Sequence, residues 1–303
     1  TPTRRVHALL AGFVQDSLIE NQSHCHKTEK IVPQTFFSKR QRRDLPKRFL
    51  YWTTCYYVDG MLVDTGCAHC ASGLLHAMAG KPLGRIANTH THEDHIGGNA
   101  PLQRLALARG LNPDFEILVH PLGLPVLTDP HRAQPLHPYR RVFWGWPEPC
   151  QGRAVADGEL IETEHHAFQV IYTPGHSQDH LCLYEPTQGW LFSGDLFVGG
   201  KDRAIRQGSD IWTIIASLKR IAALPVEWLF AGSARVRQSP VQELADKIEY
   251  YESLGQQMLD LHRRGFSETQ IVRRLCGGPM TVERVTLGHF SRCWLVRAYL
   301  NQS

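Results

Sequence analysis

The sequence predicts an α/β protein with a helical region at its C-terminal end. Over the first two thirds of the 303 residues, strand-like and helix-like segments alternate, and from Pro240 onward every periodic segment has helical spacing. An apolar fraction of 42% and a charged fraction of 20% are typical of a globular chain that buries a sizeable core. We therefore predict a main α/β domain over residues 1–237 and a helical appendage over residues 238–303.

The individual elements follow from local patterns. Residues 6–14 are apolar but end in Gln15-Asp16, which favours a first strand over a signal peptide. Residues 49–58 and 60–63 predict a hairpin with Asp59-Gly60 as its turn. Further strands are predicted at residues 85–89, 115–119, 168–172, 180–184, 190–192 and 227–231, and helices at 72–78, 102–108, 211–223, 241–264, 267–276 and 282–300.

Charge and cysteine usage limit the partners and the compartment. The net charge of +4 is mild, and the one dense basic run, residues 38–48, is interpreted as a solvated loop rather than a nucleic-acid contact. The eight cysteines have no disulfide-framework spacing, which favours a reducing compartment and a cytoplasmic location. No apolar run approaches membrane-spanning length, so we expect no membrane association.

Four of the cysteines invite specific interpretations. Cys55 and Cys182 lie in apolar strand-like segments and are predicted to be small core residues. Cys67 and Cys70 form a lone CxxC, which together with His24-Cys25-His26 could hold an accessory zinc ion. The second half of the usual spacing is missing, so the role of this pair stays open.

Residues 126–150 differ in composition from the rest of the chain and are rich in proline, arginine and aromatic side chains. A long loop of this kind forms either a binding wall or a proline-stiffened surface crossing. If it is a wall, the candidate substrate contacts are Tyr139, Arg141, Phe143, Trp144 and Trp146.

The stretch THTHEDHIGG, residues 89–98, is the strongest sign of chemistry in the chain. In an extended backbone, residues two apart point to the same side, so His90 and His92 can hold one metal ion. Asp94 and His95 follow too soon to reach that ion and are better placed to start a second site. The alternative is a solvated histidine-rich loop, and the dense spacing favours the metal site.

Two later turns place further ligand types at strand ends. His176 lies in Thr173-Pro174-Gly175-His176-Ser177, directly after one predicted strand, and Asp195 ends Ser193-Gly194-Asp195 after another. Each turn alone is common loop chemistry. A two-metal site needs ligands from more than one loop, so these two residues are candidates to complete it.

Taken in order, these motifs resemble the metallo-β-lactamase superfamily. The matching residues are Asp64-Thr65-Gly66, the HxHxDH loop, Thr173 to Ser177 with His180, and Ser193-Gly194-Asp195. The resemblance covers roughly residues 50–235 and looks most like the glyoxalase-II-like and lactamase-beta-2-like branches. It implies a four-layer αββα sandwich with the metals at one edge, followed here by the helical appendage.

The resemblance also implies a role for each motif residue. It assigns His90, His92 and His176 to a first metal, Asp94 and His95 to a second, and Asp195 to a bridge between them. Asp64 would hydrogen-bond and orient the ligand loop. His180 would lie near the site without binding a metal, or else be a hydrogen-bonded core histidine.

One position departs from the family pattern. The family usually supplies a last histidine to the second metal from a Gly-His-Gly turn, and here Ser233 stands at that place in Gly232-Ser233-Ala234. A neutral hydroxyl is a poor zinc ligand beside imidazole. We expect weaker binding of the second metal rather than its loss, because three protein ligands and a hydroxide still make an open catalytic site.

The expected function is metal-dependent hydrolysis. A metal-bound hydroxide, oriented by Asp94, would attack an ester or thioester carbonyl of a small metabolite. One or two zinc ions are expected, with manganese or iron as options. A Gly-x-Ser-x-Gly motif is absent, which argues against a serine hydrolase. The stretch from Asp195 to Ser233 has no room for an inserted nuclease domain, so we expect a small-molecule substrate, with a homodimer left open.

Three other functions stay open at this point. His90, His176 and Asp195 could form the facial triad of a mononuclear iron oxygenase of the persulfide dioxygenase type. A small-substrate phosphodiesterase or ribonuclease would use the same two metals. A non-catalytic metal-binding protein with a degraded second site is the third, and Ser233 is its main support.

Overall fold

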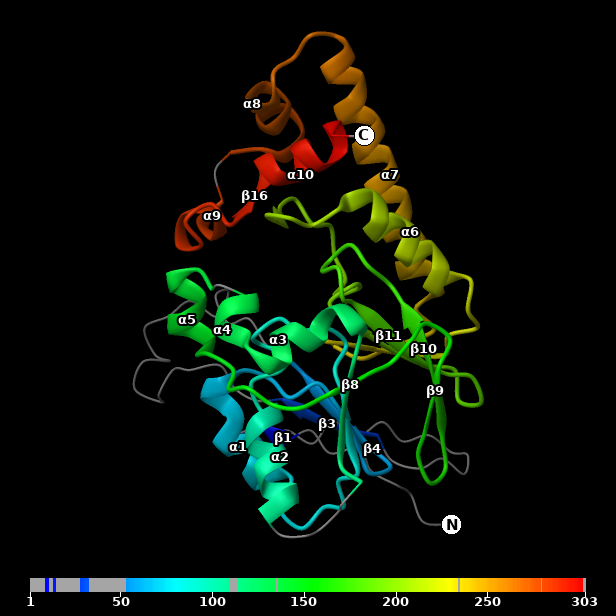
Figure 1. Cartoon of the computed structure of the whole chain (residues 1–303). Coiled ribbons are helices and arrows are strands. Elements are labelled where there is room, and N and C mark those ends of the chain that lie inside the picture. Colours follow the sequence, from blue (N-terminus) through cyan, green and yellow to red (C-terminus); the bar gives the residue numbers. More distant parts are fainter. Residues whose placement is uncertain are drawn as a thin grey trace.

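The computed structural model describes residues 53–108, 114–134, 136–233, 235–278 and 280–301, with short strand segments at 9–10, 13–14 and 28–32. Two large β-sheets lie face to face, and helices cover the outer face of each (Figure 1). One apolar cluster fills the space between the sheets, and two further clusters lie between each sheet and its helices. The predicted αββα sandwich is confirmed.

The first sheet has the strand order β2-β1-β3-β4-β5-β6-β7-β8. Its strands are β1 (Leu9–Leu10), β2 (Phe13–Val14), β3 (Thr28–Val32), β4 (Cys55–Val58), β5 (Met61–Val63), β6 (Arg85–Ala87), β7 (Glu116–Val119) and β8 (Arg153–Ala154). From β5 to β8 the neighbours run parallel, so their carboxyl ends meet at one edge. The ligand loop leaves this edge, directly after β6.

The predicted hairpin is confirmed as β4 and β5, which pair antiparallel around Asp59-Gly60. Both turn residues have positive φ, 48° and 79°, as a two-residue type I′ turn requires. The two faces of the strands serve different layers: Tyr56 and Val58 enter the core between the sheets, and Cys55 faces the outer helices. Positions 49–52 of the prediction lie outside the described residues.

The second sheet has the order β15-β14-β12-β11-β10-β9 and is antiparallel except for the pair β12 and β14. Its strands are β9 (Leu160–Glu162), β10 (Ala167–Tyr172), β11 (Leu181–Glu185), β12 (Trp190–Gly194), β14 (Trp228–Ala231) and β15 (Arg237–Gln238). All but the two edge strands match the sequence prediction within one or two residues. Cys182 and Cys55 are both fully buried, which confirms their prediction as core residues.

The outer helices differ between the two sheets. Helices α1 (Ala71–Ala77) and α2 (Asn99–Ala108) cover the first sheet, while α6 (Ile211–Ala222) covers the second. The predicted cap of α6 is present, since Asp210 accepts hydrogen bonds from the backbone N–H groups of Trp212 and Thr213 at 3.0 and 3.2 Å. None of the helices in the described ranges is long and apolar enough to cross a membrane.

The C-terminal helices extend the core of the second sheet. They are α7 (Val241–Arg263), α8 (Glu268–Ile271), the π-helical turn Val272–Cys276, α9 (Thr281–Val285) and α10 (Arg292–Leu300). Leu244 and Met258 of α7 and Leu295 of α10 share one buried cluster with Ile214 of α6. Helices were predicted for this region and are present, and they pack against the helix that covers the second sheet.

Two sequence predictions were wrong in detail. Residues 126–150, predicted as a long loop, contain most of α3 (Leu124–Thr128) together with α4 (Pro130–Ala133) and α5 (Pro138–Trp144). Their prolines lie in the first turn, where a missing N–H costs nothing, so proline starts these helices instead of preventing them.

The second error is the single helix predicted at residues 282–300. It is interrupted at Leu287 and Gly288, which both have positive φ, and by β16 (Phe290–Ser291). Strand β16 pairs antiparallel with β13 (Ile205–Arg206), a short strand in the segment after β12. This small sheet carries the C-terminal segment toward helix α5, above which α9 lies in Figure 1.

Candidate metal centre

The candidate ligands lie in loops that leave the strands at one edge of the sandwich. His90, His92 and His95 follow β6, His176 follows β10, and Asp195 follows β12. Gly194 allows the close packing of these loops, because a Cβ added there would lie 2.7 Å from both His180 Nε2 and Thr89 Oγ1. The fold thus brings together residues that are far apart in the sequence.

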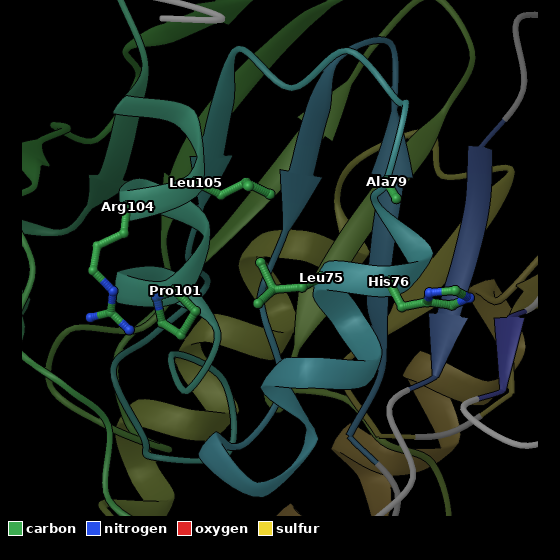
Figure 2. Close-up of a pocket in the computed structure, with 6 residues that line it drawn as sticks. All are labelled: Leu75, His76, Ala79, Pro101, Arg104 and Leu105. Carbon is green, nitrogen blue, oxygen red and sulfur yellow. The ribbon is translucent and has the colours of Figure 1, made fainter. Parts of the chain in front are cut away.

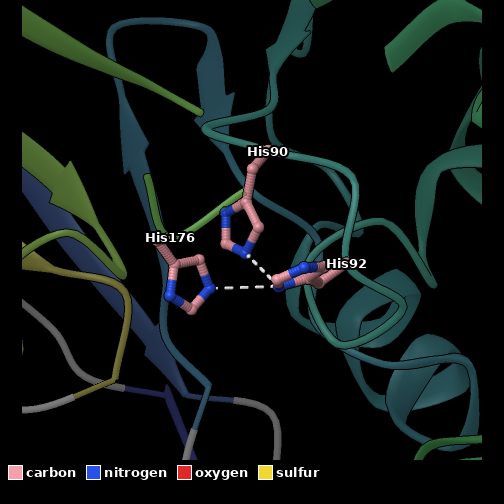
Figure 3. A group of neighbouring side chains, drawn as sticks. All are labelled: His90, His92 and His176. Carbon is pink, nitrogen blue, oxygen red and sulfur yellow. Dashed lines mark hydrogen bonds between the residues drawn. The ribbon is translucent and has the colours of Figure 1, made fainter. Parts of the chain in front are cut away.

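The first ligand group consists of His90, His92 and His176, whose ligand atoms all lie within 4.8 Å of one another. His92 Nδ1 lies 3.0 Å from His90 Nε2 and 3.0 Å from His176 Nε2, so three ring nitrogens face a common point (Figure 3). Burial lowers the pKa of all three imidazoles, for His90 and His92 well below the usual range. They are therefore neutral, which is the form that binds a metal.

The second ligand group consists of His90, His95 and Asp195. His95 Nε2 lies 3.5 Å from Asp195 Oδ2 and is buried without a hydrogen-bond partner. The same Asp195 oxygen lies 3.8 Å from His176 Nε2, so this carboxylate stands between the two groups. His95 Nε2 thus has no hydrogen-bond partner and faces the carboxylate of Asp195, and the three imidazoles of the first group lie beside it. This set of donor atoms fits a divalent metal that takes nitrogen and oxygen ligands.

Asp64 forms hydrogen bonds with the loop that carries the candidate ligands. Its carboxylate accepts hydrogen bonds from the backbone N–H and the hydroxyl of Thr89, both at 2.8 Å. It also faces His95 Nδ1 at 2.8 Å, which aims the other ring nitrogen at Asp195. Burial alone would lower the pKa of His95, but the carboxylates of Asp64 and Asp195 raise it well above the usual value.

His180 lies beside the first group without belonging to it. Its ring centroid is 5.2 Å from that of His90, and its Nδ1 lies 2.8 Å from Thr173 Oγ1. The ring is fully buried, and burial lowers its pKa well below the usual range. This placement fits both sequence interpretations, a neighbour of the site and a hydrogen-bonded core histidine.

A family model described as the metallo-beta-lactamase superfamily matches residues 53–233. The match covers more than half of the chain and includes every predicted ligand. The chain belongs to the metallo-β-lactamase superfamily.

Individual relatives agree with this assignment. A hydroxyacylglutathione hydrolase of Maricaulis maris is 34% identical over 151 residues, which are 49% of this chain and 47% of that protein. The beta-lactamase-like protein 2 homolog of Drosophila melanogaster is 28% identical over 202 residues, 63% of this chain and 59% of that protein. The chain spans about half the length of the curated relatives it matches.

Solved structures show the same fold at low sequence identity. A beta-lactamase domain protein from Burkholderia ambifaria has a TM-score of 0.63 at 15% identity, with 90% of this chain and 86% of that chain covered. The fold is therefore the one that the motif order predicted.

Ser233, at the place where the resemblance implies a last histidine ligand, lies beside the second ligand group. Ser233 Oγ donates a hydrogen bond to Asp195 Oδ1 at 3.3 Å. The preceding Gly232 packs tightly, because an added Cβ would lie 2.8 Å from Asp195 Oδ1 and 3.0 Å from His95 Cε1. The turn after β14 reaches the second group, but it presents a hydroxyl instead of an imidazole.

Asp94 is placed differently from the other predicted ligands. It belongs to neither ligand group in the described part of the chain. Thr53 Oγ1 donates to its Oδ2 at 3.3 Å, and Arg140 Nη2 lies 3.6 Å from its Oδ1. Its role as a ligand of the second metal stays a prediction.

The structure adds two arginines that the sequence analysis missed. Arg140, buried on α5, donates from Nε to the buried carboxylate of Glu93. Arg206 on β13 contacts His92 Nε2 through Nη1. Glu93 was the available signal: a carboxylate inside a buried metal loop needs a cation nearby.

The residues of the predicted substrate wall differ in their contacts. The oxygen of Tyr139 lies 2.7 Å from His289 Nδ1, and His289 Nε2 accepts from Arg206, which contacts His92. Arg141 is exposed and lies over the ring of Trp146, at 5.2 Å from its centroid. The rings of Phe143 and Trp144 form a tilted pair with centroids 6.2 Å apart.

Two other features lie apart from the ligand groups. The thiols of Cys67 and Cys70 are buried, with sulfurs 3.4 Å apart, while the predicted partners at residues 24–26 lie outside the described residues, as does the basic run at 38–48. A pocket between α1 and α2 (Figure 2) is lined by Leu75, His76, Ala79, Pro101, Arg104 and Leu105, and by none of the predicted ligands.

Proposed function

We propose that this chain is a metal-dependent hydrolase acting on the ester or thioester bond of a small metabolite. The observation that carries the proposal is the pair of ligand groups on either side of Asp195. When bound there, divalent metal ions activate a water molecule and polarise the substrate carbonyl. We propose zinc as the metal, held first by His90, His92 and His176.

The names of the relatives support the bond type. Hydroxyacylglutathione is a thioester, and a hydrolase named for it is 34% identical to this chain over 151 residues. Because the chain spans about half of that protein, its own substrate is part of our proposal. A small-molecule substrate, no nucleic-acid partner and a cytoplasmic location belong to the same proposal.

The residues around the two ligand groups hold hydrogen-bonding side chains where a water molecule would attack the carbonyl. His95 and Asp195 are aligned by Asp64, which accepts from the loop backbone and fixes the ring of His95. Asp94, held by Thr53 Oγ1 and Arg140 Nη2, offers a carboxylate that can accept a hydrogen bond from the attacking water. These contacts hold the acceptor groups in place before the substrate arrives.

An iron oxygenase is the second candidate. His176 Nε2 and Asp195 Oδ2 are 3.8 Å apart, and with His90 they offer two imidazoles and one carboxylate. The observation that favours this alternative is Ser233, which leaves the second group without its usual last imidazole.

Metal content and substrate turnover separate the two functions. We expect protein purified without added metal to contain zinc or manganese and to cleave S-lactoylglutathione or another small thioester or ester without consuming oxygen. One iron ion per chain, with oxygen uptake on a persulfide, would establish the oxygenase instead. A site that stays empty in excess metal would contradict both.

A further inference from the structure

Arg206 lies beside the first ligand group, in contact with His92. It lies on β13, in the segment that follows Asp195, and is held there by pairing with β16 of the C-terminal region. Within the described residues, its guanidinium makes hydrogen-bond contacts with two imidazoles: Nη1 contacts His92 Nε2, and Nε donates to His289 Nε2 at 3.1 Å. A cation whose partners are neutral rings is not electrically compensated by them.

The contact with His92 conflicts with the ligand role of that ring. His92 presents Nδ1 to His90 and His176, so Nδ1 is the atom available to a metal (Figure 3). A neutral imidazole bound through one nitrogen carries its proton on the other, which is then a donor. Arginine offers only donors, so Arg206 loses this acceptor whenever His92 serves as a ligand.

The contact with His289 orients a second donor. Because Arg206 Nε can only donate, His289 Nε2 is the acceptor and the proton of the ring lies on Nδ1. That N–H donates to the Tyr139 oxygen at 2.7 Å, which leaves the phenolic hydrogen of Tyr139 free to donate elsewhere. His137 stacks on His289 with ring centroids 4.0 Å apart and limits its movement.

The carboxylates nearby are engaged by other groups. Glu93 accepts from Arg140, and Asp94 lies between Thr53 and the same arginine. Arg140 itself is a second guanidinium near Arg206, and its Nη1 is buried without a hydrogen-bond partner. The region next to the first ligand group therefore has an excess of positive donors over free acceptors.

We propose that Arg206 and Tyr139 bind an anionic group of the substrate, a carboxylate or a phosphate, beside the first ligand group. The inference rests on the proposed thioester or ester hydrolysis and names its substrate class. His289 is the positioning residue: it holds the guanidinium and the phenol in one orientation, and it brings the C-terminal region into substrate recognition.

The test compares Arg206→Gln with Arg263→Gln, an exposed arginine on α7 that pairs with Asp260. Three thioesters carry the same lactoyl group: S-lactoylglutathione with carboxylates, lactoyl-coenzyme A with phosphates, and uncharged S-lactoyl-N-acetylcysteamine. We expect Arg206→Gln to lower kcat/KM about tenfold or more for one charged thioester, mainly through KM, and to spare the neutral one. The charged substrate that is affected identifies the anionic group. Tyr139→Phe should give the same selectivity with a smaller loss.

Two readouts do not depend on turnover. Zinc content should be equal in wild type and Arg206→Gln, because a glutamine carbonyl can accept from His92 Nε2. Inorganic phosphate, titrated calorimetrically into the zinc-loaded proteins, should bind about tenfold more weakly to Arg206→Gln than to wild type or Arg263→Gln.

The possible failures can be told apart. Equal losses on charged and neutral thioesters, or a loss of zinc from Arg206→Gln, would overturn the role of Arg206 in binding an anion. If the wild-type protein hydrolyses none of the three thioesters, the proposed function fails for these substrates. The phosphate titration then tests the anion site independently of that function. Unchanged phosphate affinity in Arg206→Gln would overturn that site.

Discussion

The two ligand groups share one edge of the sandwich but differ in how completely they are built. In the first, His92 Nδ1 lies 3.0 Å from a nitrogen of each partner, and all three side chains are imidazoles. In the second, His95 and Asp195 are 3.5 Å apart, and Ser233 donates to Asp195 from the place of a further ligand. In this chain the turn after β14 therefore keeps its place beside the second group, although its tip carries a serine instead of the usual histidine.

The largest effect should come from breaking the first group at its centre. His92→Ala removes the ring that touches both partners, so we expect loss of the first metal and a fall in kcat/KM of about 1000-fold, since a bound metal supplies several kcal/mol of catalysis. Metal analysis and thioester turnover measure both. His131→Ala, an exposed histidine stacked on Trp146, should leave both unchanged. Turnover that survives without the first metal would show that the second group suffices.

An intermediate effect should come from the residue that aligns the second group. Asp64 has φ of 58°, a conformation that asparagine tolerates, so Asp64→Asn changes the charge without adding backbone strain. We expect the affinity for the second metal to fall by about 10- to 100-fold, as for other hydrogen-bond partners of metal ligands. Stepwise competition with a chelator resolves the two sites, and the melting temperature checks the fold. If the first site weakened equally, the two groups would not be separable as described.

The smallest effect should come from restoring the missing imidazole. Ser233→His should raise the affinity for the second metal by about tenfold, because nitrogen replaces a weakly binding hydroxyl. Ser233→Ala is the matched control and should bind as wild type does. An unchanged affinity in Ser233→His would mean that another group already fills the position.

The ligand loops could be predicted from the sequence because their spacing is local. His90 and His92 are two residues apart in an extended segment, and each later ligand follows a strand with a clear apolar pattern. Arg206 and His289 could not be found in this way. Arg206 and His289 are 83 residues apart and meet because β13 pairs with β16, a contact that no local pattern records.

The prolines of residues 126–150 show a different limit. Pro130 and Pro138 contribute to the loop prediction, although each lies in the first turn of a short helix. Proline is common both in the first turn of a helix and in loops. Whether the residues after it form a helix depends on how the following turn packs. Within α5 the sequence prediction names Arg141 but not its buried neighbour Arg140, which donates to Glu93.

The pairing of β13 with β16 also sets an order of events during biosynthesis. A chain is made from its N-terminal end, and domains fold as their segments become available. The ligand loops, from His90 to Asp195, all precede the strand that holds Arg206 in place. In a growing chain, all the candidate metal ligands are therefore synthesised before the strand that positions Arg206.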